Sequence, residues 1–343
     1  MKKYIIATLS ILCVLPIFAQ EQRTLEKDES ISHIKPTDPD FKALYGGGGV
    51  DGVPANALTP EKIARLREVE QISKDANDGS GEAMAKLGDF YASGEFFPVD
   101  MAQAVTWWYM AANNGSDVGL CRMGEVTFAG IVIKRNKHKA CNYWKLAAKL
   151  GNADAQYFLG SCYAGGQGVY QDYENAVFWW RKAAATGHLK AMNNLAFCYA
   201  RGEGVKERDP KLAADLWRKA AEGGILNAQT QLGLCYYSGE GVKKDLAMAA
   251  NIWTNAAEKG DAYAQRLLGM AYYYGWGVDI DKKQAQILFL AASVQGDDEA
   301  RKMHDELILQ IGTRKATDPA PKVMPTVQKT KNPSPRESAF DKF

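Results

Sequence analysis

The sequence predicts an all-α protein, an α/α superhelical solenoid of about six repeats with a capping helix at each end. One observation is a small residue, usually the glycine of a Leu-Gly pair, that returns every 36 or 37 residues at Gly88, Gly124, Gly160, Ala196, Gly233 and Gly269. A second is a large aromatic residue with the same period, at Trp108, Trp144, Trp180, Trp217, Trp253 and Phe289. Such a period is typical of solenoids, in which each unit buries its apolar face only against its neighbours.

Helix signals divide each repeat into two helices. A capping helix begins at Thr59-Pro60-Glu61, where a hydroxyl precedes proline and an acid. In the third repeat, residues 153–164 form helix A, the glycine-rich segment 165–169 forms a turn, and Asp172 caps helix B, which ends at Gly187. A closing helix follows Gly296 through residue 311. The predicted solenoid covers residues 58–312, with repeats at about 81–116, 117–152, 153–188, 189–224, 225–260 and 261–297.

The repeated glycine of the Leu-Gly pair lies in the middle of helix A, where glycine costs about 1 kcal/mol relative to alanine. We expect the reason to be a close approach of the helix B tryptophan to the helix A backbone. Two turns depart from the common Gly-x-Gly-Val pattern. The second repeat has Ile131-Val132-Ile133, and the first has Phe96-Phe97 in place of Gly-Val.

The two ends of the chain have a different composition from the repeats. Residues 1–20 have two lysines and then an apolar run, which predicts a secretory signal peptide too short to span a membrane. Residues 21–57 are expected to be a disordered linker, and residues 313–343 a disordered tail rich in proline and lysine. The mature protein is therefore predicted to be exported, periplasmic or extracellular, without stable membrane insertion.

Charge gives little support for a nucleic-acid partner. The chain has 42 Lys and Arg against 40 Asp and Glu, and removal of Lys2 and Lys3 would leave it formally neutral. A phosphate-binding face normally requires a basic excess. No nucleic acid is therefore expected among the partners.

The positions of the cysteines in the repeats suggest a role in packing rather than in catalysis. Cys162, Cys198 and Cys235 each stand two positions after the Leu-Gly anchor, a position that also holds Phe90, Val126 and Ala271, so a buried apolar slot is expected. Cys121 and Cys141 belong to the two helices of one repeat, and a bridge between them is an alternative to free thiols.

Motifs for catalysis or metal binding are scarce. The four histidines have no ligand spacing to another His or Cys, so neither a metal nor a cofactor is expected. Ser32-His33-Ile34-Lys35 matches the Ser-x-x-Lys motif of serine penicillin-recognising enzymes, but the companion motifs Ser-Asp-Asn and Lys-Thr-Gly do not occur in the sequence. We interpret the match as chance, and we name no catalytic residue.

The repeat pattern closely resembles the Sel1-like repeat, a relative of the tetratricopeptide repeat. Its residues are Ala155, Leu159-Gly160, Tyr163, Gly166-x-Gly168-Val169, Asp172, Ala176, Trp180, Ala183-Ala184 and Gly187. The resemblance implies an α/α superhelix and an adaptor or scaffold role, in a family with many exported bacterial members. It also implies an alternative, because some cysteine-rich relatives are described as binding or hydrolysing β-lactams. Those relatives have paired cysteines in successive repeats, which this chain lacks.

The resemblance further implies that helix A lines the concave face, where residues that differ between repeats would contact a partner. The candidate binding residues are Tyr157, Asn193, Phe197, Thr230, Leu234, Tyr237, Arg266, Met270 and Tyr273. Their apolar and aromatic bias suits a peptide or helix in a groove, although packing against the next repeat is the alternative. The predicted function is therefore a non-enzymatic scaffold that binds a protein or peptide of the cell envelope. A β-lactamase-like hydrolase and a binder of cell-wall fragments are the alternatives.

Overall fold

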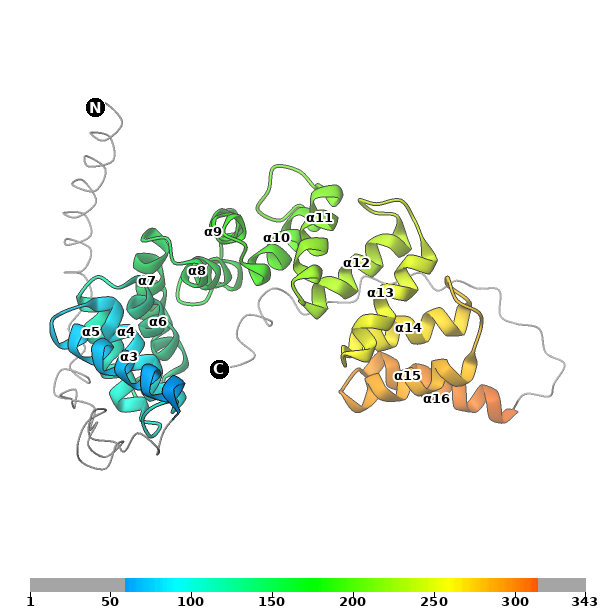
Figure 1. The fold of residues 1–343 in the computed structure, drawn as a ribbon. Coiled ribbons are helices and arrows are strands. Elements are labelled where there is room, and N and C mark those ends of the chain that lie inside the picture. Colours follow the sequence, from blue (N-terminus) through cyan, green and yellow to red (C-terminus); the bar gives the residue numbers. More distant parts are fainter. Residues whose placement is uncertain (1–58, 314–343) are drawn as a thin grey trace. The chain divides into compact units, whose positions relative to one another are not determined.

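The computed structural model describes residues 59–313, in which every regular element is an α-helix (Figure 1). A predicted all-α repeat fold is thereby confirmed. The fourteen helices are α3 (Pro60–Asn77), α4 (Gly81–Ser93), α5 (Met101–Asn113), α6 (Asp117–Ala129), α7 (Lys137–Lys149), α8 (Ala153–Gly165), α9 (Tyr173–Ala185), α10 (Leu189–Arg201), α11 (Pro210–Glu222), α12 (Leu226–Ser238), α13 (Leu246–Glu258), α14 (Ala262–Tyr274), α15 (Lys282–Val294) and α16 (Asp298–Thr313).

The described helices form two compact units. The first unit contains α3 to α8 and ends at Asp172, and the second begins at Tyr173 and contains α9 to α16. Within each unit a helix packs mainly against the helices before and after it in the chain. This neighbour-to-neighbour packing is the physical signature of repeat proteins.

Polar side chains and glycines fix the ends of the repeat helices. Helices α5, α7, α11, α13 and α15 begin at an Asp or Asn whose side chain accepts hydrogen bonds from the first turn. Helices α4, α6, α8, α10, α12 and α14 end at a glycine with a positive φ. Glycine adopts this left-handed conformation without steric cost, so the turn chemistry determines where helix A ends.

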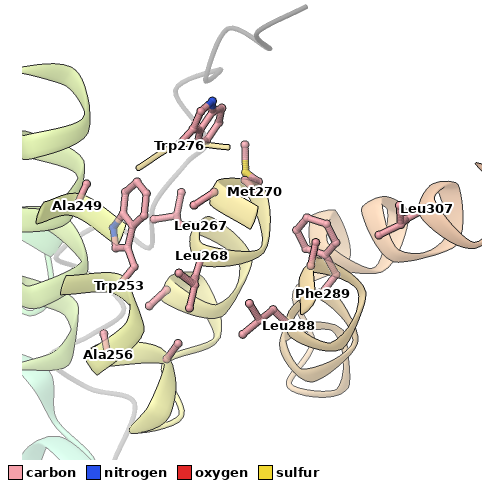
Figure 2. Packing of buried hydrophobic residues seen from close by; sticks show 14 residues of the cluster. Ala249, Trp253, Ala256, Leu267, Leu268, Met270, Trp276, Leu288, Phe289 and Leu307 are labelled. Carbon is pink, nitrogen blue, oxygen red and sulfur yellow. The ribbon is translucent and has the colours of Figure 1, made fainter. Parts of the chain in front are cut away.

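The predicted approach of helix B to the mid-helix glycine is confirmed in the repeats that lie within one unit. A Cβ atom added to Gly233 would lie 2.3 Å from Nε1 of Trp253. At Gly88 and Gly124 the corresponding distances to the tryptophan rings are 2.4 Å, and at Gly269 the distance to Phe289 is 2.7 Å. Figure 2 shows Trp253 and Phe289 within the buried cluster of the last repeats. Each glycine therefore makes room for a ring of the core.

A second close approach, which the sequence did not predict, involves the second glycine of the Gly-x-Gly turn. A Cβ atom at Gly168 would lie 2.3 Å from the carbonyl oxygen of Lys137, the first residue of α7. At Gly204, Gly241 and Gly277 the distance to the first residue of the preceding helix B is 2.1 Å. Each of these turns therefore approaches the backbone of the neighbouring repeat too closely for a side chain at its second glycine.

The second repeat has Val132 at this position, with φ of +65°. The structure also corrects the expected register, because Gly130 keeps the place of the first turn glycine and only the second one is replaced. Val132 is the one non-glycine residue with a positive φ in the described part of the chain. A β-branched residue is strongly disfavoured there.

Replacement of Val132 by glycine is expected to stabilise the first unit. The left-handed backbone costs a non-glycine residue about 1–2 kcal/mol, and the extra freedom of glycine in the unfolded chain offsets about 0.5–1 kcal/mol of that gain. We therefore expect Val132→Gly to raise the free energy of unfolding in urea by roughly 0.5–1 kcal/mol. Ile131→Gly is the matched control, since Ile131 has no positive φ, and it should lower stability. Equal effects of the two substitutions would contradict the strain at Val132.

Candidate functional site

The structure places the nine candidate binding residues in two groups. Five of them are buried, namely Tyr157, Asn193, Phe197, Thr230 and Met270. Phe197 packs edge-on against Trp217 at 5.2 Å between ring centres, and Thr230 Oγ1 donates to Asp261 Oδ1 at 3.2 Å. Burial raises the pKa of Tyr157 to about 12. Burial leaves these five side chains little surface for a partner, and their role in binding stays a prediction.

Four candidates, Leu234, Tyr237, Arg266 and Tyr273, are partly exposed. Arg266 already has strong partners, because its Nε lies 2.8 Å from Asp297 Oδ2 and its Nη1 lies 2.5 Å from Glu299 Oε2. Its guanidinium also lies over the ring of Tyr263, at 4.9 Å from the centroid. Arg266 therefore joins α14 to the start of α16. The other three candidates, Leu234, Tyr237 and Tyr273, lie near the C-terminal ends of α12 and α14.

Four aromatic side chains form a cluster at the ends of α12 and α14, which we call the aromatic cluster: Tyr237, Tyr273, Tyr274 and Trp276. The rings of Tyr237 and Trp276 are 4.7 Å apart, and Tyr274 stacks on Trp276 at 5.1 Å with an interplanar angle of 19°. Tyr273 meets Tyr274 edge-on at 4.7 Å. Trp276 is buried and the three tyrosines are partly exposed, so the indole supports a tyrosine surface.

Sequence reasoning missed Tyr274 and Trp276. Trp276 occupies the variable position of its Gly-x-Gly turn, where the three preceding turns have Gln167, Glu203 and Glu240. An apolar residue among polar equivalents was a readable signal, because turns normally face water. The second repeat also has an apolar residue at this position, Ile131, so it is the aromatic ring that distinguishes the last repeat.

Two lysines lie over the rings of the aromatic cluster. Lys244 Nζ is 5.8 Å from the centroid of Tyr237, and Lys282 Nζ is 5.1 Å from that of Tyr273. The Tyr273 hydroxyl donates to Gln310 Oε1 at 2.7 Å, which links α14 to α16. Burial raises the pKa of the Tyr237 and Tyr274 hydroxyls, so both are neutral at physiological pH. The surface thus combines apolar rings with positive charge.

The five cysteines of the described residues are buried free thiols. Cys121 Sγ lies 3.6 Å from Glu125 Oε1 and Cys141 Sγ donates to the carbonyl oxygen of Gln167 at 3.0 Å, so these two do not form the bridge left open above. Burial raises the pKa of Cys198 and Cys235 to about 12. The expected buried slot is confirmed, and such thiols are poor nucleophiles.

Other predictions are untested or limited to the described residues. Within residues 59–313, no group of His, Cys, Asp and Glu is arranged to hold a metal ion, and no helix is long and apolar enough to cross a membrane. The predicted signal peptide, linker and tail lie outside the described residues, as does the Ser32–Lys35 motif.

The fold defines a class, that of α/α helical-repeat proteins built from pairs of 13-residue helices. The Sel1 repeat family matches six segments of the chain, residues 81–116, 118–152, 153–188, 189–225, 226–261 and 262–297. These segments make up more than half of the sequence, and the chain belongs to the Sel1 repeat family.

Two solved structures are similar to this chain. One is a protective antigen of uropathogenic Escherichia coli strains that displays an SLR fold, with 32% identity and a TM-score of 0.64 over 73% of this chain and 53% of the antigen. This chain therefore spans about half the length of that antigen. The other is a Sel1 repeat protein from Oxalobacter formigenes, with 30% identity and a TM-score of 0.59 over 77% of this chain and 73% of that protein. A search of curated proteins found no match.

Proposed function

We propose that this protein is an exported, non-enzymatic scaffold that binds a protein or peptide partner of the cell envelope. The observation that carries the proposal is the aromatic cluster at the ends of α12 and α14, with Lys244 and Lys282 over its tyrosines. Tyrosine presents a large rigid surface at low entropic cost and is enriched at protein interfaces. The family supports a binding role, because helical repeats offer extended surfaces rather than enclosed catalytic sites.

The chemistry of the cluster favours an apolar segment with nearby acidic groups. Such a segment would place side chains against Leu234 and the tyrosine rings, while its carboxylates would approach the two lysines. Export is inferred from the composition of residues 1–20, and the cell envelope is the compartment that such a leader serves.

Removal of two tyrosine rings should abolish partner capture. In pull-downs from envelope extract, we expect Tyr237→Ala/Tyr273→Ala to lose the partners of the wild type, because interface tyrosines often contribute about 2 kcal/mol, roughly thirtyfold in affinity. Tyr170→Ala is the matched control, since Tyr170 is 97% exposed. Lys244→Glu/Lys282→Glu reverses the charge without removing a ring, and it should also weaken capture. Partner lists identical to the wild type for both double variants would contradict the proposal.

An enzymatic role is tested separately with a chromogenic β-lactam. We expect no turnover by the purified mature protein. Turnover that disappears in Tyr237→Ala/Tyr273→Ala would contradict the scaffold proposal and favour a hydrolase. Capture of cell-wall fragments in place of a polypeptide by the same surface would equally contradict a protein partner.

A further inference from the structure

A pocket of about 510 Å³ lies in the first unit, far in sequence from the aromatic cluster. Its walls come from α4 and α6, the turns that follow them, and α5. Phe90, Trp108 and Val126 supply apolar surface, and Met101 and Ile131 stand at the side formed by the turn. A pocket of this size holds several side chains of a bound peptide.

The pocket lies beside the turn in which Val132 replaces the second glycine. In the third repeat, Gly168 lies against the start of α7, and Lys137 Nζ donates to Gln167 Oε1 at 3.0 Å, so turn and helix are in direct contact. The equivalent residues in the second repeat are Val132 and Met101, at the same separation of 31 residues. A valine cannot approach the backbone as closely as glycine does, and the adjacent Ile131 lines the pocket together with Met101.

The polar wall of the pocket contains three charged side chains that bond to one another. Arg122 Nε donates to Asp89 Oδ1 at 3.0 Å, and its Nη1 lies 3.3 Å from both oxygens of Glu125. The Trp108 indole Nε1 also donates to Asp89 Oδ1, at 3.1 Å. Within the described residues, Asp89 Oδ2 accepts no hydrogen bond. Two carboxylates face one guanidinium, so the wall has a net charge of −1.

Charges of both signs surround this wall. Glu95 also lines the pocket and pairs with Arg65 of α3. Burial raises the pKa of the Glu125 carboxyl, the nearby Asp154 adds to that rise, and Arg122 opposes it. A second cation beside Glu125 would favour its ionised form in the same way as Arg122 does. An anion would instead meet the carboxylates of Asp89 and Glu125, and the guanidinium of Arg122 beside them already bonds to both.

We propose that this pocket binds a basic side chain, Lys or Arg, on an extended segment of a partner protein. The cationic head would lie against Asp89 and Glu125, and its aliphatic stem against Phe90 and Trp108. The indole and phenyl faces attract a cation as well as methylene groups. Flanking apolar residues of the segment would cover Val126 and Ile131.

The test uses two fluorescein-labelled pentapeptides that differ at one position, Ac-Ala-Val-Lys-Val-Ala and its norleucine counterpart, titrated with the full-length mature protein by fluorescence anisotropy. We expect the lysine peptide to bind at least about tenfold more tightly than the norleucine peptide. Glu125→Gln and Asp89→Asn should each remove most of that difference. Glu82→Gln is the matched control, because Glu82 is an exposed acid on the same helix, α4, paired with Lys86.

Val132→Gly is a variant in which weaker binding could not result from unfolding, because the substitution is expected to stabilise the unit. It should also let the turn close on α5. Weaker peptide binding by this variant therefore supports the pocket. The proposal is overturned if the norleucine peptide binds equally well, or if Glu125→Gln and Val132→Gly both bind like the wild type. It is also overturned if free n-pentylamine displaces the lysine peptide as effectively as unlabelled peptide does, since the site would then recognise a small amine. Tyr237→Ala/Tyr273→Ala should bind the lysine peptide normally. The experiment therefore distinguishes failure of the pocket proposal from failure of the proposed function at the aromatic cluster.

Discussion

Truncation of Trp253 to alanine is expected to lower the free energy of unfolding of the second unit by about 3–5 kcal/mol, the range for large aromatic residues in cores. The indole is fully buried among Leu267, Leu268 and the alanines of α13. Its Nε1 donates to the carbonyl oxygen of Thr230 at 3.2 Å, so the substitution also leaves a buried acceptor without that donor. Urea unfolding followed by circular dichroism measures the loss.

The chain itself provides the matched control for this substitution. The last repeat has Phe289 at the equivalent position, where its ring packs against Gly269 as Trp253 packs against Gly233. Trp253→Phe should therefore cost much less, about 1–2 kcal/mol, because a ring still fills most of the space. A Trp253→Ala variant that is no less stable than Trp253→Phe would contradict the view that these rings hold the repeats together.

The helical pairs and the glycine–tryptophan contact could be predicted because they repeat. Glycine in the middle of a helix lowers helix stability, so its return in several repeats needs one common cause. The large aromatic residue of helix B returns with the same period and supplies that cause. The contact of Gly168, Gly204, Gly241 and Gly277 with the preceding repeat was missed for a physical reason. Positive φ alone explains a turn glycine, and the additional close approach depends on how successive repeats pack.

The binding residues were less predictable than the fold. Thr230 and Met270 vary between repeats like surface residues, but they are buried, because neighbouring repeats differ in the side chains that pack between them. Variation between copies therefore reports local packing as well as recognition. The pocket beside Ile131 lies next to the turn in which Val132 replaces a glycine, and the space between that turn and α5 appears only in three dimensions.

Substitution of Gly277 by alanine should cost far more than the same change at Gly296, although both glycines have a positive φ. The φ angles are +72° and +93°, so each substitution carries the penalty of about 1–2 kcal/mol for a left-handed residue. At Gly296 a new Cβ would meet nothing within 4 Å. At Gly277 it would lie 2.1 Å from the carbonyl oxygen of Leu246 and 2.5 Å from the nitrogen of Ala247, which are backbone atoms.

Backbone atoms at a helix start cannot rotate away as a flexible side chain can, so α13 and the turn must separate. Forced displacement of packed elements adds typically about 1–3 kcal/mol. Thermal unfolding of the two variants should therefore show a small decrease in Tm for Gly296→Ala and a decrease at least about twice as large for Gly277→Ala. Equal decreases would mean that the turn glycine is needed only for its φ. In that case Val132→Gly would also not be expected to bring the turn of the second repeat closer to α5.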